Sequence, residues 1–350
     1  MADIITLPGL IDPHVHLRDP GQTHKEDFFT GTSAALAGGV TAVVDMPNNK
    51  TLVTTEGLLD EKIRLAKEKA VCDIGFNFGT LGDNFDEFPK IYDKVIGLKI
   101  YLNVTTGGFI IDKEKLESIY AAWESDKPIF LHSEEDVSDL VGPAIKKYPK
   151  RTHLCHISSA AELSFMIGLK NQGLPITGGV TPHHLFLDES DRSSLGAFGH
   201  MKPYLKPKAD QVFLWENIDS IDVIESDHAP HAIEEKNTDN TLFGVPGLET
   251  TLPLMLTAEA EGKISRAQIL EKLHTNPAKL IGVQPDPNTK IEVDMSEYEI
   301  KNEELKTKCG WSPFAGRRVV GKVQKVFIRG NLAYENGKVI ANKGSAKIIS

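Results

Sequence analysis

The sequence has few cysteines, no long apolar run and no clustered positive charge. Its three cysteines, Cys72, Cys155 and Cys309, lie far apart in the chain, which excludes a disulfide framework. No apolar run approaches the roughly 18 residues of a membrane helix, and no basic leader precedes an apolar stretch near the first residue. We therefore expect a cytoplasmic protein that makes no membrane contact.

Acidic residues outnumber basic ones, and the formal net charge is −10. Because binding to a phosphate backbone requires clustered Lys and Arg, we expect no nucleic-acid partner. The chain has 350 residues, of which 40% are hydrophobic and 25% charged, the composition of an ordinary globular protein with one or two domains. A soluble enzyme acting on a small molecule fits these bounds.

Short apolar segments alternate with amphipathic stretches along most of the chain. Stretches of helical period cover residues 55–70 and 160–170, for example. This repeated alternation predicts an α/β fold, a (β/α)₈ TIM barrel over residues 8–285. A doubly wound open sheet would alternate in the same way, but no GxGxxG follows the first segment. The apolar segments are GLIDPHVHL, GVTAVVDMPN, CDIGFNFGT, VIGLKIYLN, KPIFLHSE, THLCHIS, LPITGGVTPHH and SIDVIESDHAP.

The pattern of apolar and polar residues changes after Val283. A turn-rich PDPNTK is followed by a charged stretch at 290–305 and then by short β-type segments with an Asn-Gly turn at residues 336 and 337. We expect residues 286–350 to form a small β-rich extension packed on the barrel, together with residues 1–7.

Histidine and aspartate recur where the apolar segments end. His14 and His16 lie two residues apart, so strand alternation places both side chains on one face. His132, His156 and Asp227 end later segments, and the C-terminal ends of barrel strands converge on one site. A lone His on a strand is more often structural, but several strand ends of this kind favour a metal site. Imidazole and carboxylate suit Zn²⁺, with Mn²⁺, Co²⁺ and Fe²⁺ as alternatives.

Lys99 is an unusual residue for the interior of the fourth segment. It could extend to the rim or pair with Glu134 or Glu135. Alternatively, its amine could have reacted with CO₂ to give a carbamate that bridges two cations. Periodicity leaves both interpretations open.

The pattern of HxH, Lys, two separate His and Asp resembles the amidohydrolase superfamily. Longer segments are similar to the dihydroorotases, notably the dihydroorotase domain of the multifunctional animal proteins of pyrimidine synthesis. The similarity runs from Leu7 to about Gly337. Its motifs are LPGLIDPHVHLRDPGQTHKEDF, ALAGGVTAVVDMPN, GLKIYLN, TPHHLFL, ESDHAPH and GVPGLET.

The resemblance implies two zinc ions per chain. His14, His16 and Asp227 would hold one zinc, His132 and His156 the other, and a carboxylated Lys99 would bridge both. Asp227 would also act as the catalytic acid and base. The implied reaction is the reversible conversion of N-carbamoyl-L-aspartate to dihydroorotate in pyrimidine biosynthesis.

The resemblance also implies substrate contacts. Arg18, Asn48 and His231 would bind the substrate carboxylate, and the backbone of residues 244–247, including Pro246, would meet the ring. Lys202 stands where the animal domain has an Arg, and Thr105 lies in the position of a substrate-covering loop.

Two departures from the animal domain limit these implications. Gly179 replaces a Glu that helps to hold an additional metal there, so we expect no third metal. Thr106 replaces an aromatic residue of the substrate-covering loop.

Three rival interpretations remain open at this point. An allantoinase or a dihydropyrimidinase (hydantoinase) would share the metal ligands, but these relatives generally lack an Arg at the position of Arg18. An inactive dihydroorotase-like assembly subunit would lose ligands, whereas all six are present here. The family expectation is a homodimer, and the resemblance allows association with aspartate transcarbamoylase.

Overall fold

The computed structural model describes residues 3–103, 111–134, 138–238 and 242–350 and arranges them around two sheets. Eight consecutive parallel strands form the larger sheet, which confirms the predicted barrel. The ring closes where Val15 bridges His228 and the His16 amide donates to the His228 carbonyl at 2.8 Å. The barrel strands are β2 (Leu10–Val15), β3 (Val40–Asp45), β4 (Asp73–Gly79), β5 (Gly97–Tyr101), β6 (Ile129–His132), β7 (Thr152–Leu154), β8 (Ile176–Val180) and β9 (Val223–Ile224).

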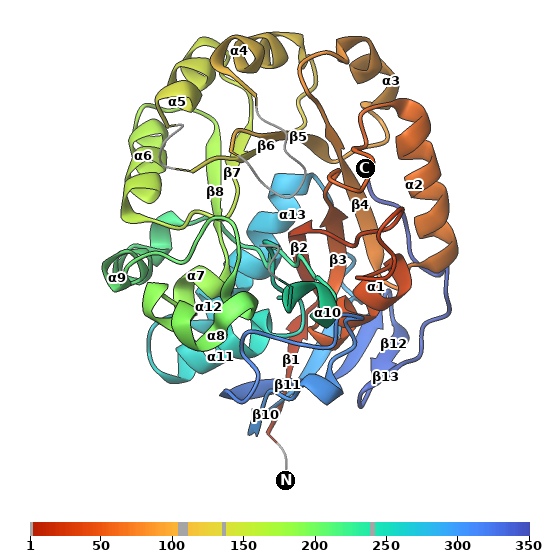
Figure 1. Ribbon diagram of the computed structural model, residues 1–350. Helices are drawn as coiled ribbons and strands as arrows, with labels where there is room; N and C mark the ends of the chain where they lie inside the picture. Colours follow the sequence, from red (N-terminus) through yellow and green to blue (C-terminus); the bar gives the residue numbers. More distant parts are fainter. Residues whose placement is uncertain (1–2, 104–110, 135–137, 239–241) are drawn as a thin grey trace.

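Helices surround the barrel on the outside (Figure 1). Two of them match the predicted amphipathic stretches and begin at capping side chains: Thr55 accepts from the Leu58 amide before α2, and Ser159 from the Glu162 amide before α6. The helices are α1 (Phe28–Ala37), α2 (Glu56–Lys69), α3 (Phe88–Ile91), α4 (Lys113–Ala122), α5 (Ser138–Lys147), α6 (Ala160–Asn171), α7 (Pro182–Phe186), α8 (Arg192–Leu195), α9 (Lys208–Glu216), α10 (Ile233–Lys236), α11 (Thr251–Ala260), α12 (Arg266–Leu270) and α13 (Asn276–Ile281).

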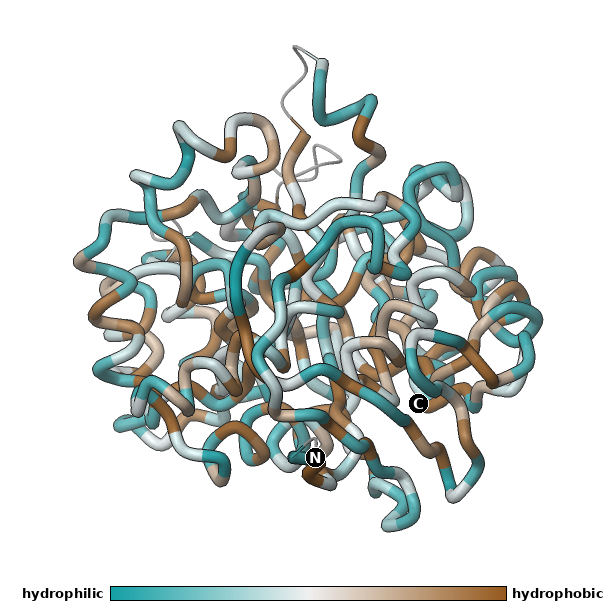
Figure 2. Tube along the Cα trace, turned by 90° about the horizontal axis from the view of Figure 1, so that it is seen from below, coloured by the Kyte–Doolittle hydropathy of each residue, from teal (hydrophilic) through white to brown (hydrophobic). Residues whose placement is uncertain are grey.

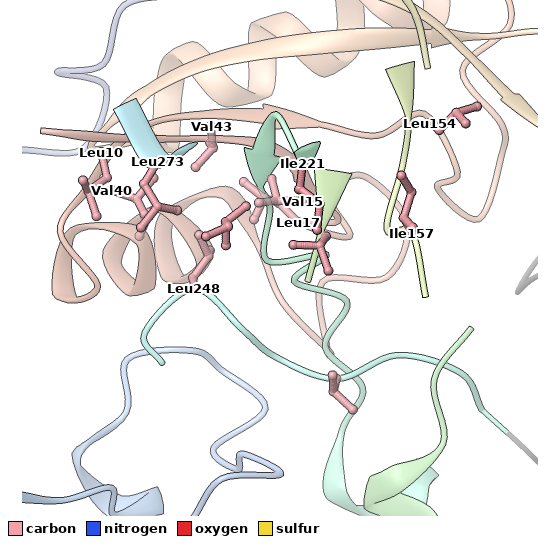
Figure 3. Close-up of a cluster of buried hydrophobic side chains, with 14 of the residues drawn as sticks. Leu10, Val15, Leu17, Val40, Val43, Leu154, Ile157, Ile221, Leu248 and Leu273 are labelled. Carbon is pink, nitrogen blue, oxygen red and sulfur yellow. The ribbon is translucent and has the colours of Figure 1, made fainter. Parts of the chain in front are cut away.

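The core lies between the barrel strands and this ring of helices. All residues of β2, β3 and β5 are buried, as expected for parallel strands covered on both faces. A cluster of buried apolar side chains includes Leu10, Val15 and Leu248 (Figure 3). Hydrophilic and hydrophobic residues alternate along much of the chain trace (Figure 2).

Three residues that follow barrel strands have a left-handed backbone. Arg18 lies beyond β2 with φ 63°, His156 beyond β7 with φ 41°, and Asp227 beyond β9 with φ 43°. Non-glycine residues rarely adopt this conformation, which costs of order 1–3 kcal/mol for each residue. The chain therefore turns sharply at each of these positions and leaves the strand with its side chain at the barrel mouth.

The second sheet is antiparallel and has the order β1-β10-β11-β12-β13. The predicted turn joins β12 to β13, and both of its residues have positive φ, 47° at Asn336 and 81° at Gly337. The charged stretch that was not predicted as a strand forms β10, because buried Ile291 and Val293 alternate with its polar residues. The strands are β1 (Ile4–Pro8), β10 (Lys290–Glu299), β11 (Arg318–Ile328), β12 (Asn331–Glu335) and β13 (Lys338–Val339).

The last residues of the chain return to the barrel. The Ile74 amide in β4 donates to the Lys347 carbonyl at 3.0 Å, and the Ile349 amide donates to the Ile74 carbonyl at 3.0 Å. This segment ties the second sheet to the barrel. In the described part of the chain, no helix has the length and apolar character needed to span a bilayer.

Candidate active site

A small cavity that opens to solvent lies at the C-terminal ends of the barrel strands. Eight of the twelve predicted site residues line it, whereas Lys99, His231 and Pro246 lie outside its lining. Thr105 falls outside the described residues. The lining residues are His14, His16, Arg18, Asn48, Tyr101, His132, His156, Lys202, Asp227, Ala229, Phe243 and Gly244.

The first ligand cluster joins both ends of the barrel sequence. The Asp227 Oδ1 atom lies 3.0 Å from His16 Nε2 and 3.5 Å from His14 Nε2. Asn48 Oδ1 lies 2.6 Å from His16 Nδ1 and accepts a hydrogen bond from it. The proton of the neutral ring therefore stays on Nδ1, and Nε2 is the nitrogen with a lone pair. One atom from each of His14, His16 and Asp227 lies within 4.8 Å of the others, so the set can hold one metal ion.

The second pair of histidines comes from neighbouring strands. His132 ends β6, His156 follows β7, and His132 Nδ1 lies 2.9 Å from His156 Nε2. The remaining ring nitrogens, His132 Nε2 and His156 Nδ1, have no hydrogen-bond partner among the described residues. The two nitrogens that face each other, His132 Nδ1 and His156 Nε2, are the ones placed to share one cation.

Burial fixes the charge state of these groups. Burial lowers the pKa of His14 to about 4, and it also lowers the pKa values of His16, His132 and His156. Burial acts to raise the pKa of Asp227, but His14 and His16 outweigh it, and the pKa lies well below its usual range. The site therefore presents neutral imidazoles and an ionised carboxylate at neutral pH, the donor set that a divalent cation such as Zn²⁺ prefers.

Lys99 is fully buried beneath the cavity. Its Nζ atom lies 3.2 Å from Cys155 Sγ, and among the described residues no carboxylate is within 4.0 Å of it. Glu134, the partner that an ordinary ion pair would use, instead lies 3.5 Å from His132 Nε2 and 3.7 Å from Lys202 Nζ. Glu135 falls outside the described residues. A buried amine without a countercharge is unusual and fits a lysine that carries CO₂ in the working protein.

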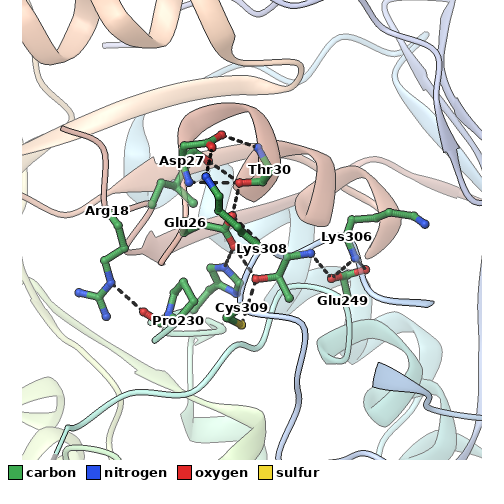
Figure 4. A network of polar contacts seen from close by, with 12 residues as sticks. Arg18, Glu26, Asp27, Thr30, Pro230, Glu249, Lys306, Lys308 and Cys309 are labelled. Atoms are coloured by element: carbon green, nitrogen blue, oxygen red, sulfur yellow. Dashed lines mark hydrogen bonds and ion pairs between the residues drawn. The ribbon is translucent and has the colours of Figure 1, made fainter. Parts of the chain in front are cut away.

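Arg18 supplies positive charge to the lining of the cavity. It is 4% exposed, and its Nε atom donates to the Pro230 carbonyl at 3.1 Å (Figure 4). Within the described residues it forms no ion pair with a carboxylate. His231 lies behind it, where Nδ1 accepts from Lys25 Nζ at 3.1 Å and Nε2 donates to the Phe243 carbonyl at 2.9 Å. The guanidinium thus remains available to an anion in the cavity.

A polar network holds the segment that follows Arg18 (Figure 4). Glu26 is fully buried, bonds the Thr307 hydroxyl and accepts from the Lys308 amide at 3.2 Å. Asp27 caps α1 and pairs with Lys308 Nζ at 2.8 Å. These contacts fasten the barrel mouth to the segment between β10 and β11.

The loop after α10 forms another part of the rim. Gly244 lines the cavity, whereas Pro246, two residues on, is buried beside it. Lys236 donates to three carbonyls, those of His200 at 3.0 Å, Leu242 at 2.9 Å and Gly244 at 3.1 Å. Two of these carbonyls belong to the loop, so the Lys236 side chain connects it to His200.

Sequence reasoning missed two features of the site. Tyr101 lines the cavity, and its buried hydroxyl has no hydrogen-bond partner among the described residues. It lies two residues after Lys99, so strand alternation could have indicated it. The bond from His16 to Asn48 had no signal in the sequence, because it joins side chains that only the folded barrel brings together.

Comparison with known proteins finds an amidohydrolase family model and dihydroorotase relatives that agree with each other. A model of the amidohydrolase family matches residues 5–162. The dihydroorotase of Pyrococcus furiosus is 36% identical over 369 residues, covering 99% of this chain and 85% of that protein. The multifunctional protein CAD of Squalus acanthias is 42% identical over 344 residues, which cover 97% of this chain but only 15% of that protein's length.

Solved structures show the same fold at lower sequence identity. An L-hydantoinase from Arthrobacter aurescens matches with a TM-score of 0.93 and 22% identity, over 98% of this chain and 88% of the other. The inactive dihydroorotase-like domain of a CAD-like protein from Chaetomium thermophilum matches with a TM-score of 0.85 and 23% identity, over 99% of each chain. At such identities the likeness establishes the fold alone.

Proposed function

The chain belongs to the amidohydrolase family and, within it, to the dihydroorotases, and on that premise we propose that it interconverts N-carbamoyl-L-aspartate and (S)-dihydroorotate. The forward reaction closes the ring and releases water, as a step of pyrimidine biosynthesis. The observation that carries the proposal is the buried guanidinium of Arg18, which borders a cavity that also contains the histidine and aspartate cluster.

Arg18 distinguishes between cyclic amides. A buried cation without an anion is unfavourable, so a site built around one is complete only when a ligand supplies negative charge. Both N-carbamoyl-L-aspartate and dihydroorotate carry a carboxylate that a planar guanidinium can bind through two hydrogen bonds. Lys202 at the rim of the cavity would add a second positive charge.

The donor set supports two zinc ions. His14, His16 and Asp227 would hold one, His132 and His156 the other, and Lys99 as a carbamate would join both. When bound, zinc would supply an activated water and polarise the amide carbonyl of the ring.

The chain's own groups would bind the substrate and move the proton. Arg18 fixes the carboxylate and thereby orients the ring amide over the cluster. The Asp227 carboxylate, ionised at neutral pH, accepts the proton of the attacking water and delivers it to the departing ring nitrogen. In ring closure Asp227 takes the proton from the carbamoyl nitrogen and passes it to the departing hydroxide, which leaves as water. Asn48 keeps His16 in one tautomer throughout, and His231 packs behind Arg18.

Two other functions fit the fold but are less well supported by the residues of the site. A dihydropyrimidinase, as suggested by the hydantoinase structures, acts on an uncharged ring and would leave Arg18 without an anion. An inactive assembly subunit would not need a complete ligand set, whereas all six predicted ligands are present here.

A turnover assay on one metal-analysed sample tests the proposal. Dihydroorotate should be hydrolysed, while dihydrouracil, which lacks the carboxylate, should be rejected by about 10³-fold or more. Equal turnover of the two compounds, or preference for allantoin, would overturn the assignment.

We also propose a homodimer, as expected for the family, and an association with aspartate transcarbamoylase. The match to one segment of a multifunctional protein supports the second proposal. Sedimentation of the chain alone and of its mixture with aspartate transcarbamoylase would test both proposals.

A further inference from the structure

We propose that Glu225 is a positioning residue that orients His14 and the backbone of His156, and so holds ligands of both metals in place. The inference rests on the proposed function, because it assumes that these histidines bind metal.

Glu225 lies in the barrel interior directly after β9 and is fully buried. Its Oε1 atom accepts from the His156 amide at 2.6 Å and lies 3.5 Å from His14 Nδ1. Its Oε2 atom lies 3.3 Å from His153 Nε2. One carboxylate therefore meets residues from two other parts of the barrel, β2 and the β7 segment.

The contact with His14 is a charge contact at 3.5 Å, longer than a hydrogen bond, and it favours a proton on Nδ1. With its proton on Nδ1, facing Glu225, His14 presents the Nε2 lone pair to Asp227 and His16. Carboxylates that accept from the second nitrogen of a ligating histidine fix the ring in this way and raise its basicity. Burial acts to raise the pKa of Glu225, but His14 and His153 outweigh it and keep the carboxyl group ionised.

The contact with His156 acts on the backbone. His156 has φ 41°, a conformation that is unfavourable for a residue with a side chain. The hydrogen bond from its amide to Glu225 compensates part of this cost and directs the ring toward His132.

Gly179 provides the space for Glu225. A Cβ atom at residue 179 of β8 would lie 2.6 Å from the Glu225 carboxyl carbon and 2.6 Å from Oε1. In sequence, Gly179 stands where the animal domain has a carboxylate. The structure shows that a carboxylate from the neighbouring strand fills the same place.

A rival role for Glu225 is direct ligation. His14, Cys155 and Glu225 each offer one atom, all within 4.8 Å of one another, so they could hold a third cation. The observed contacts favour positioning, because both Glu225 oxygens already face nitrogen donors of the chain.

The test compares zinc binding by wild type, Glu225→Gln and Gly179→Ala. Zinc affinity is measured by competition with a chelator, and stoichiometry by elemental analysis. Both variants should bind zinc about 10- to 100-fold more weakly than wild type, and ¹⁵N NMR of the metal-free protein should show a change in the His14 tautomer in Glu225→Gln. Glu249→Gln is the control, because the Glu249 carboxylate also accepts backbone amides, of Lys306 and Thr307, away from the ligands.

A double variant covers the case in which Glu225→Gln does not fold. Glu225→Ala combined with Gly179→Glu returns a carboxylate to the same place from β8 and should restore zinc affinity to within about tenfold of wild type. Unchanged affinity in folded Glu225→Gln would overturn the proposal, as would a third wild-type zinc that Glu225→Gln alone loses. Zinc binding is measured without substrate, so a protein that binds zinc normally but does not turn over dihydroorotate would refute the proposed function instead.

Discussion

Replacing Arg18 by Met tests the charge on which the assignment depends. Met keeps a long side chain and has no special preference for φ 63°, so the backbone cost at this position stays the same while the guanidinium is lost. Arg18 is 4% exposed, so the substrate carboxylate that it binds would be largely desolvated. Loss of one partner of such a pair costs about 2–5 kcal/mol. The kcat/KM for dihydroorotate should therefore fall by about 30-fold to several thousand-fold.

The assay follows ring opening of dihydroorotate and of dihydrouracil with the same metal-analysed samples. Metal content should stay at the wild-type level, because Arg18 is not a ligand, and turnover of dihydrouracil should not fall. The control is Arg64→Met, which removes an exposed Arg from a helix surface where it pairs with Glu61 and Glu68. Equal loss on both compounds in Arg18→Met would show that Arg18 supports the fold of the site, and the carboxylate argument would fail.

Three further perturbations address the metals, the cavity and pH. Lys99→Ala should abolish turnover and deplete at least one metal, and an added short carboxylic acid should restore part of the rate; full metal content and rate would contradict the bridge. Tyr101→Phe should lower kcat at least tenfold without lowering the melting temperature, since a buried hydroxyl without a partner gives no stability. Burial lowers the pKa of His183 to about 4, so below pH 6.5 the unfolded chain binds a proton that the folded chain does not. The free energy of unfolding of the metal-free protein should therefore fall as the pH falls. Between pH 7 and pH 5 the His183→Asn variant should lose about 2 kcal/mol less of this free energy than wild type, as measured by urea unfolding. The same pH dependence in both proteins would contradict the lowered pKa of His183.

The barrel could be predicted because its strands are apolar throughout and its helices are not. The same alternation placed His14, His132 and Asp227 at strand ends, and those ends converge in any closed barrel. The sequence could not show that the charged stretch of β10 is a strand, since only two buried residues mark it.

The contacts around the ligands were harder to foresee. Whether Gly179 leaves a gap or accommodates Glu225 depends on the distance between two neighbouring strands, which no local pattern encodes. The same holds for Asn48, which reaches His16 across strands. The roles of Arg18, His231, Lys202 and Pro246 toward substrate stay predictions until a ligand is bound.

The left-handed backbone at Arg18, His156 and Asp227 has a consequence for laboratory evolution. Each residue holds a conformation that glycine would adopt without penalty, so Gly at these positions would relieve of order 1–3 kcal/mol of backbone cost. A library selected for heat resistance alone would accept such a change wherever the released energy exceeds what the lost side chain contributed to folding. The heat-resistant variants would then include proteins without catalytic activity. A selection for stable and active enzyme must therefore combine every round of heating with growth that depends on the product of the reaction.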